Sequence, residues 1–143
     1  MSKIYLVRHG LVDYQSLGLS AQGRAFAERL PSLLPPDVDF LATDVEPRCQ
    51  ETIGPLARHL RLTPKTYAKE TFAAGLPLMD AAEAKVAVIC YRIESVNPLL
   101  LRLGFPPFTQ ADRDTSYEKI LVHINENGRL TLQTLATGQR KPA

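Results

Sequence analysis

Short apolar runs alternate with helical segments along most of this chain, and this alternation restricts its fold more than any other feature. Three runs have the length and composition of buried strands: residues 4–7, 40–42 and 86–90. Each is followed by a helical segment, and the first of these begins at Ser20, a good N-cap, and ends before Pro35. Strands that alternate with helices predict a mainly parallel sheet covered on both faces.

The last part of the chain departs from this alternation. Residues 117–135 contain two strand-like runs separated by Asn127 and Gly128, a pair typical of a type I′ turn. They predict an antiparallel hairpin at one edge of the sheet. The expected fold is therefore an α/β, three-layer α/β/α sandwich, built as a single domain over residues 1–143, since a chain of this length holds one core.

The first apolar run ends in Arg8, His9 and Gly10. Open α/β sheets bind ligands at the carboxyl ends of their strands, where this tripeptide is expected to lie. An imidazole at such a place can attack phosphorus, while a neighbouring guanidinium holds phosphate oxygens in its planar fork. The tripeptide therefore marks a candidate site for phosphoryl chemistry.

Further signals follow in a fixed order over about the first sixty residues: Leu19, Ser20 and Gly23 at a helix start, then Arg48 and Thr52 at a second helix start. This order resembles the histidine phosphatase superfamily, the phosphoglycerate-mutase-like proteins. The resemblance implies that His9 is the nucleophile that becomes phosphorylated, and that Arg8 and Arg48 clamp the phosphoryl group. Pro47 suits a first helical position, so Arg48 and the free N–H groups of that turn can face the same anion.

The second half departs from the family pattern at the end of the strand at residues 86–90. Family members carry a second histidine there, followed by two glycines, whereas this chain has Tyr91, Arg92 and Ile93. A phenol offers one hydrogen bond where an imidazolium would offer a full charge. Arg92 either restores positive charge by turning inward or is an exposed arginine beside Glu94. Both Tyr91 and Arg92 are candidate substrate-binding residues.

Family enzymes also protonate the leaving group with a carboxylic acid. Glu70 fits the usual place of that acid, some twenty residues past the second arginine, and is the candidate taken here. Asp13, close after His9, and Glu46, close before Arg48, are the alternatives on loops expected to border the same site. The other two histidines, His59 and His123, are expected to be structural or surface residues.

The interval between Glu70 and Tyr91 is too short to hold the long cap of larger family members. The pocket is therefore expected to be open, as in the small phosphohistidine-phosphatase-like branch of the superfamily. Two functions follow from the resemblance. One is a weak phosphatase acting on phosphomonoesters or phosphohistidine through phospho-His9. The other is a degenerate relative that binds phosphate, a phosphorylated small molecule or a phosphoprotein without turnover.

Composition restricts partners and compartment. The formal net charge of +2 is too small to predict nucleic-acid binding. The first apolar run is interrupted by Arg8, so neither a signal peptide nor a membrane span is expected, and the protein is predicted to be cytoplasmic.

Cys49 and Cys90 lack the spacing of a zinc site, and neither is followed after six residues by the arginine of a cysteine phosphatase. No metal or cofactor is expected, and Cys90 is predicted to pack in the core.

Overall fold

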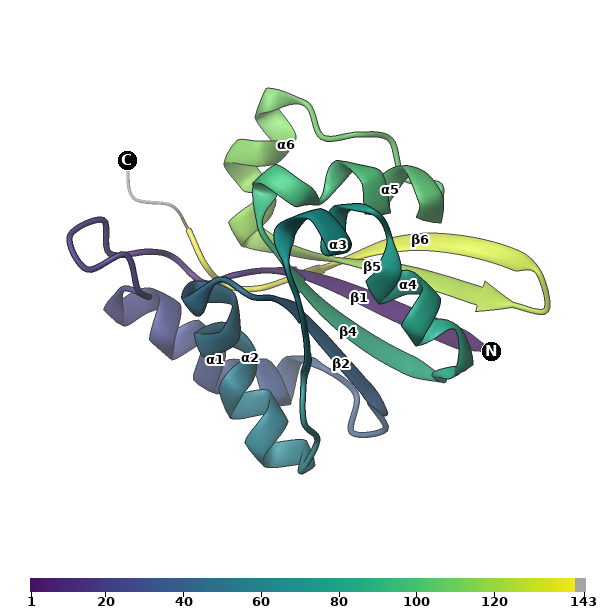
Figure 1. The fold of residues 1–143 in the computed structure, drawn as a ribbon, viewed down its shortest axis with the longest axis horizontal. Helices are drawn as coiled ribbons and strands as arrows, with labels where there is room; N and C mark the ends of the chain where they lie inside the picture. Colours follow the sequence, from purple (N-terminus) through teal and green to yellow (C-terminus); the bar gives the residue numbers. More distant parts are fainter. Residues whose placement is uncertain (141–143) are drawn as a thin grey trace.

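The structure, a computed structural model, describes residues 1–140 (Figure 1). Its strands are β1 (Ser2–Arg8), β2 (Phe40–Asp44), β3 (Lys65–Tyr67), β4 (Val86–Tyr91), β5 (Lys119–Glu126) and β6 (Arg129–Ala136). Its α-helices are α1 (Ala21–Leu33), α2 (Pro47–Leu60), α3 (Lys69–Ala73), α4 (Leu76–Asp80), α5 (Asn97–Leu103) and α6 (Gln110–Thr115). Short 3₁₀ turns are η1 (Ala81–Glu83), η2 (Ile93–Ser95) and η3 (Ser116–Glu118).

The strands form one sheet in the order β3-β2-β4-β1-β5-β6. Strands β1, β2, β3 and β4 are parallel to their neighbours in this set, whereas β5 is antiparallel to β1 and to β6. The predicted α/β fold, with a mainly parallel sheet and an antiparallel edge hairpin, is confirmed. The carboxyl ends of β1, β2 and β4 therefore meet at one edge of the sheet, where ligands bind in such folds.

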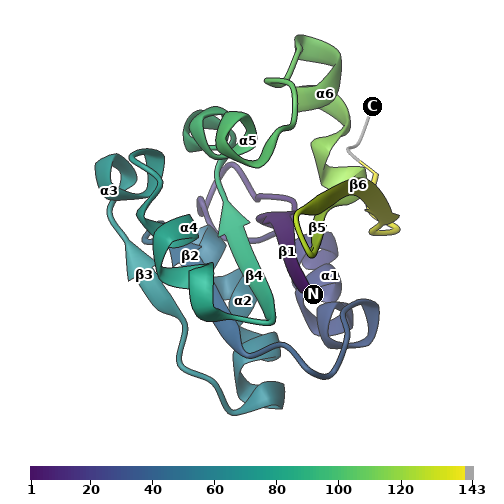
Figure 2. The same ribbon diagram turned by 90° about the vertical axis from the view of Figure 1, so that its right-hand side faces the viewer.

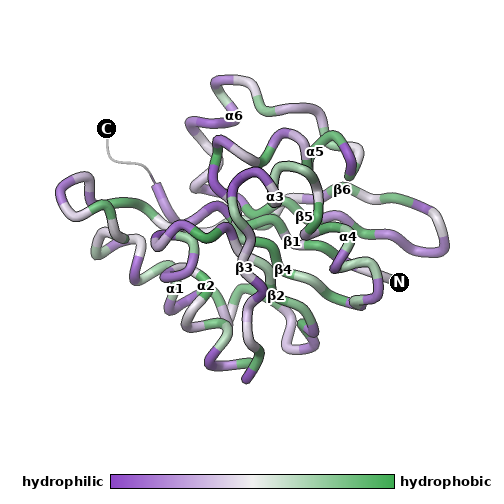
Figure 3. Tube along the Cα trace, viewed as in Figure 1, coloured by the Kyte–Doolittle hydropathy of each residue, from purple (hydrophilic) through white to green (hydrophobic). Residues whose placement is uncertain are grey.

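Alternate residues of the central strands face two separate cores. Tyr5 and Val7 of β1 pack with α1 and α2, whereas Leu6 packs with α3 and α5 on the opposite face. Figure 2 shows these helices on the two sides of the sheet. Strand β4 is buried along its whole length, and Figure 3 shows hydrophobic residues concentrated along the central strands. This double coverage explains why β4 is a continuous apolar run rather than an alternating one.

The helix and turn signals in the sequence act as expected. The Ser20 hydroxyl accepts a hydrogen bond from the Gly23 N–H at 3.1 Å and caps α1. The hairpin turns at Asn127 and Gly128, whose φ values of 54° and 85° suit a type I′ turn. Strand β3 and helix α6 were not predicted, because three residues of strand and six of helix are too short to produce a clear periodicity.

Within residues 1–140, no helix combines the length and hydropathy needed to cross a bilayer.

Cys49 and Cys90 are both free, fully buried and part of the same apolar core, as predicted for Cys90. A hydrogen bond with Cys90, together with burial, raises the pKa of the Cys49 thiol, so it is not a nucleophile at neutral pH.

Candidate active site

His9 lies just beyond the carboxyl end of β1 and has only 3% of its surface exposed. Its Nδ1 is 2.8 Å from the Gly10 carbonyl oxygen, which can only accept, so Nδ1 carries the proton and Nε2 keeps its lone pair. Burial lowers the pKa of His9 to about 4; the hydrogen bond to Gly10 opposes this shift, and the charges of Arg8 and Arg48 increase it. The ring is therefore neutral at pH 7, the form in which it can act as a nucleophile.

Thr52 fixes the backbone that follows His9. Its Oγ1 accepts a hydrogen bond from the Gly10 N–H at 2.9 Å and donates one to the Arg48 carbonyl at 2.7 Å. One buried hydroxyl thus joins the loop after β1 to the first turn of α2. The Arg-x-x-x-Thr spacing has a physical basis here, since residues four apart lie on the same face of a helix.

Glycine is needed where the loop after β1 meets the start of α1. A Cβ at Gly10 would lie 2.8 Å from the backbone oxygen of Gly23, and a Cβ at Gly23 would overlap the backbone oxygen of Leu11. The Ser20 hydroxyl also donates to the Leu11 carbonyl at 3.1 Å. The Leu-Ser-x-x-Gly signal therefore holds the loop carrying His9 close against α1.

Arg8 is held by residues about a hundred positions further along the chain. Its Nη1 donates to the Arg113 carbonyl at 3.0 Å and to the Ser116 hydroxyl at 2.6 Å. Its guanidinium carbon lies 3.8 Å from the centre of the Tyr117 ring, a cation–π contact. The edge of the same ring packs against His9, with the ring centres 5.8 Å apart. The Arg8 Nε–H is buried and has no hydrogen-bond partner within residues 1–140.

Arg48 is the second residue of α2 and follows Pro47, which begins the helix. Its Nε–H is likewise buried without a partner in the described part of the chain. Its charge, like that of Arg8, lowers the pKa of both His9 and Tyr117. The structure thus brings Arg8, His9 and Arg48 together around one place at the carboxyl edge of the sheet.

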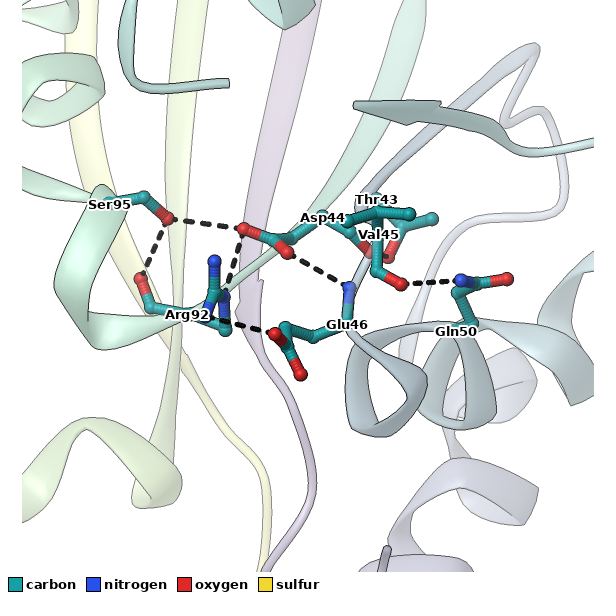
Figure 4. A network of polar contacts seen from close by, with 7 residues as sticks. All are labelled: Thr43, Asp44, Val45, Glu46, Gln50, Arg92 and Ser95. Atoms are coloured by element: carbon teal, nitrogen blue, oxygen red, sulfur yellow. Dashed lines mark hydrogen bonds and ion pairs between the residues drawn. The ribbon is translucent and has the colours of Figure 1, made fainter. Parts of the chain in front are cut away.

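Arg92 follows β4 and takes part in a buried polar network (Figure 4). The backbone N–H of His9 donates to the Tyr91 carbonyl at 3.3 Å, so the backbones of β1 and β4 still run side by side where they reach His9 and Arg92. The Arg92 Nε forms an ion pair with the fully buried Asp44 at 3.0 Å, and its Nη1 lies 3.4 Å from Glu46.

Further contacts hold Asp44 in this network. The Glu46 N–H donates to Asp44 Oδ1 at 3.0 Å, and the Ser95 hydroxyl lies 3.5 Å from Asp44 Oδ2. Of the two alternatives for Arg92, the exposed arginine is wrong: the side chain turns inward, but toward Asp44 and Glu46. Its positive charge is largely neutralised by the two carboxylates of Asp44 and Glu46.

Tyr91 lies in the core beside α3 and α5, next to its register partner Arg8, whose charge opposes the effect of burial on the pKa of the Tyr91 hydroxyl. It is fully buried beside Phe108, the ring centres lying 6.4 Å apart, and burial raises the pKa of its hydroxyl. That hydroxyl has no hydrogen-bond partner within residues 1–140. The structure therefore shows no hydrogen bond from the Tyr91 side chain to His9 or Arg48, and its role as a phosphate ligand stays a prediction.

The candidate acids differ in their surroundings. Glu70 lies exposed on α3, and no described hydrogen bond or ion pair joins its side chain to the residues around His9. Asp13 is exposed and accepts a hydrogen bond from the Gln15 N–H at 3.0 Å. Glu46 is engaged by Arg92. Glu70 therefore stays a prediction that the structure does not bring into contact with the site.

Sequence reasoning missed Glu94 and Tyr117. Glu94 is exposed on η2, directly after β4, and its negative charge raises the pKa of His9 and Tyr117. Its place just after the end of a central strand is a signal that could have identified it. Tyr117 had no comparable signal, since only packing of η3 against β1 brings it to Arg8.

Comparison with known proteins finds the same fold among solved structures. No protein-family model matches the chain, and no curated protein matches it significantly. Among solved structures, a phosphoserine phosphatase from Entamoeba histolytica has a TM-score of 0.68 at 14% identity, covering 96% of this chain and 98% of its own. The alpha-ribazole phosphatase from Shigella flexneri has a TM-score of 0.65 at 14% identity, covering 99% of both chains. The protein histidine phosphatase SixA, solved with tungstate, has a TM-score of 0.64 at 13% identity, covering 94% of this chain and 97% of its own.

These likenesses extend over nearly the whole described chain. They show that the protein has the phosphoglycerate-mutase-like fold of these phosphatases, as the resemblance in its first sixty residues predicted. At identities this low, the likeness establishes the fold alone.

Proposed function

We propose that this protein is a weak phosphatase that hydrolyses phosphomonoesters or phosphohistidine through a phospho-His9 intermediate. The observation that carries the proposal is the pair of buried Nε–H groups on Arg8 and Arg48, both without partners in the described chain and both beside the neutral His9. Leaving buried donors unpaired is costly, and a phosphoryl group would accept hydrogen bonds from both. The names of the structural neighbours, which include phosphoserine and protein histidine phosphatases, support the same chemistry.

The reaction proceeds in two steps. In the first, the lone pair of His9 Nε2 forms a bond to phosphorus, the bond from phosphorus to the leaving oxygen or nitrogen breaks, and the leaving atom gains a proton. In the second, water attacks phospho-His9 and gives a proton back to the carboxylate that protonated the leaving atom, the phosphorus–nitrogen bond breaks, and inorganic phosphate departs with the ring restored. Arg8 and Arg48 balance the negative charge of the transferring group in both steps.

Glu94 is the proton donor that the structure favours. It lies at the same edge of the sheet as His9, and its negative charge raises the pKa of the His9 imidazole. Glu70, on α3, has no such effect on the pKa of His9. Glu94→Gln is expected to slow hydrolysis of an alkyl phosphate about a hundredfold and that of p-nitrophenyl phosphate much less, because p-nitrophenolate leaves without protonation. Glu70→Gln is the matched comparison, and equal effects of both substitutions would remove the assignment to Glu94.

A second function is favoured by one specific observation. Arg92, directly after Tyr91, is paired with Asp44 and Glu46, so it does not replace the charge that a second histidine would supply to the transferring group. Losing one such electrostatic stabiliser typically lowers the rate by about 10²–10³. A protein that binds phosphate or a phosphorylated partner without turnover would have the same arrangement.

A quenched reaction with ³²P-labelled acetyl phosphate separates these two functions. A weak phosphatase acquires acid-labile label that is slowly released and that His9→Ala does not acquire. Absence of label in the wild-type protein, together with stabilisation by orthophosphate, identifies the binding function. Label that persists in His9→Ala would overturn the assignment of the nucleophile.

A further inference from the structure

A cavity of about 500 Å³ lies next to the residues around His9 and is not used by the chemistry described above. It is lined by the loop after β1, the first turn of α1 and one aromatic residue of η3: Leu11, Val12, Tyr14, Ser20, Ala21, Gln22 and Tyr117. Its volume lies within the range of small-molecule sites, roughly 300–1,000 Å³.

Tyr117 belongs to both the cavity and the candidate active site. One side of its ring is covered by the Arg8 guanidinium at 3.8 Å, its edge meets the His9 ring, and it also lines the cavity. Arg8, His9 and Arg48 do not line the cavity themselves; it adjoins them through Tyr117 and through Leu11 and Val12, which follow His9 closely in the chain. The cavity is therefore the space beside the candidate active site in which the leaving group of a phosphate monoester would lie.

The lining indicates what kind of substituent fits. Leu11 is buried and Tyr14 is 78% exposed at the rim, so the cavity has an apolar floor and an aromatic edge. The Ser20 hydroxyl is already engaged by the Leu11 carbonyl and the Gly23 N–H. Among residues 1–140 the lining contains no Asp, Glu, Lys or Arg, and Gln22 is its one amide side chain. Such a surface offers little to a charged or sugar-like group and favours a flat apolar one, which can stack against tyrosine.

We propose that this cavity binds an aromatic leaving group, so that the preferred substrates are phosphate monoesters of aromatic alcohols. The inference rests on the proposed function, because it takes the phosphoryl group to lie between Arg8, His9 and Arg48. It assigns substrate preference to the loop after β1 and to Tyr117.

Binding of phosphonates, which are not hydrolysed, tests this proposal without requiring turnover. Benzylphosphonate is expected to bind roughly ten- to a hundredfold more tightly than methylphosphonate, because its ring is removed from water in the cavity. Ala21→Phe, which fills the cavity, and Tyr14→Ala, which removes its edge, should each reduce that ratio to below about threefold. Leu132→Ala serves as the control, since Leu132 lies on β6 and lines a different hollow, and should leave the ratio unchanged.

The outcomes separate the two proposals. Equal binding of the two phosphonates to the wild-type protein would overturn the aromatic site while leaving the phosphate site in place. Failure of both phosphonates and of orthophosphate to bind would overturn the proposed function and this inference with it. A preference for benzylphosphonate that survives Ala21→Phe and Tyr14→Ala would place the aromatic site elsewhere.

Discussion

His9 combines burial with a hydrogen-bonded ring, and this combination determines how it responds to pH. In the unfolded chain it takes up a proton near its ordinary pKa of 6.5, but in the folded protein only near pH 4. The unfolded state therefore binds more protons between these values, and stability falls as the pH drops from about 6.5 toward 4. A nucleophile of this kind stays neutral, and able to react, in mildly acidic solution.

Denaturant unfolding at pH 7.5 and pH 5.0 checks this expectation. His9 should account for about 2 kcal/mol of the stability lost at pH 5.0, so His9→Asn should lose correspondingly less between the two conditions. His59→Asn is the control, because His59 is exposed near the end of α2 and should retain the wild-type loss. An identical loss in wild type and His9→Asn would show that His9 titrates normally in the folded state.

Thr52 provides a second test with a single side chain. Thr52→Val removes the only hydroxyl that accepts from the Gly10 N–H, and the unpaired buried donor should cost about 1–3 kcal/mol of unfolding free energy. Thr52→Ser keeps the hydroxyl and should recover most of that loss apart from the missing methyl group. Similar destabilisation by both variants would mean that packing, and not the hydrogen bond, is what Thr52 contributes.

At the scale of elements, the start of α1 leaves no room for a side chain at Gly23. The backbone of the loop after β1 passes so close to Gly23 that a Cβ there would meet the Leu11 carbonyl oxygen. The same contact positions the loop from which His9 projects. At the same edge of the sheet, the Asp44–Arg92 ion pair joins the end of β2 to the residue that follows β4.

Gly23→Ala is expected to destabilise the protein by about 2 kcal/mol or more, because the backbone must move apart to admit the methyl group. Gly54→Ala is the matched control within α2, where a Cβ would meet only the end of the Arg58 side chain at 3.4 Å. That substitution should be neutral or stabilise the helix by up to about 1 kcal/mol. Thermal and denaturant unfolding of the two variants distinguishes a local steric clash from a general preference for glycine.

At the scale of the whole molecule, the site exists only because the sheet brings distant segments to one edge. Arg8 and Ser116 are 108 positions apart and share a hydrogen bond, while Arg48 arrives from the start of α2. The unfolded chain has no such arrangement, so an anion bound there should stabilise the folded state specifically.

Orthophosphate at about a hundred times its dissociation constant should therefore raise the unfolding free energy by about 2.7 kcal/mol. Arg48→Ala should abolish this stabilisation. Arg58→Ala should retain it, because Arg58 lies exposed in the last turn of the same helix, away from its phosphate-facing start. Phosphate-dependent stabilisation that persists in Arg48→Ala would show that the anion binds elsewhere.

The local pattern of the sequence was enough to predict the layered fold and the hairpin turn at Asn127 and Gly128, whereas the grouping of Arg8, His9 and Arg48 was implied by the resemblance to a family. These features depend on short-range physics: strand burial, helix capping at Ser20, a proline at the start of α2, and the rule that parallel strands end at one edge. Each can be recognised within a window of a few residues.

The tertiary structure alone decided the partners of those residues. It paired Arg92 with Asp44 and packed Tyr91 into the core beside α3 and α5. It placed the charge of Glu94 where it acts on the pKa of His9, and it brought Tyr117 into contact with Arg8. These outcomes depend on which side chains meet when helices and strands far apart in the chain pack together. Such contacts are set by burial and close packing of the whole fold, which no local pattern in a single sequence contains.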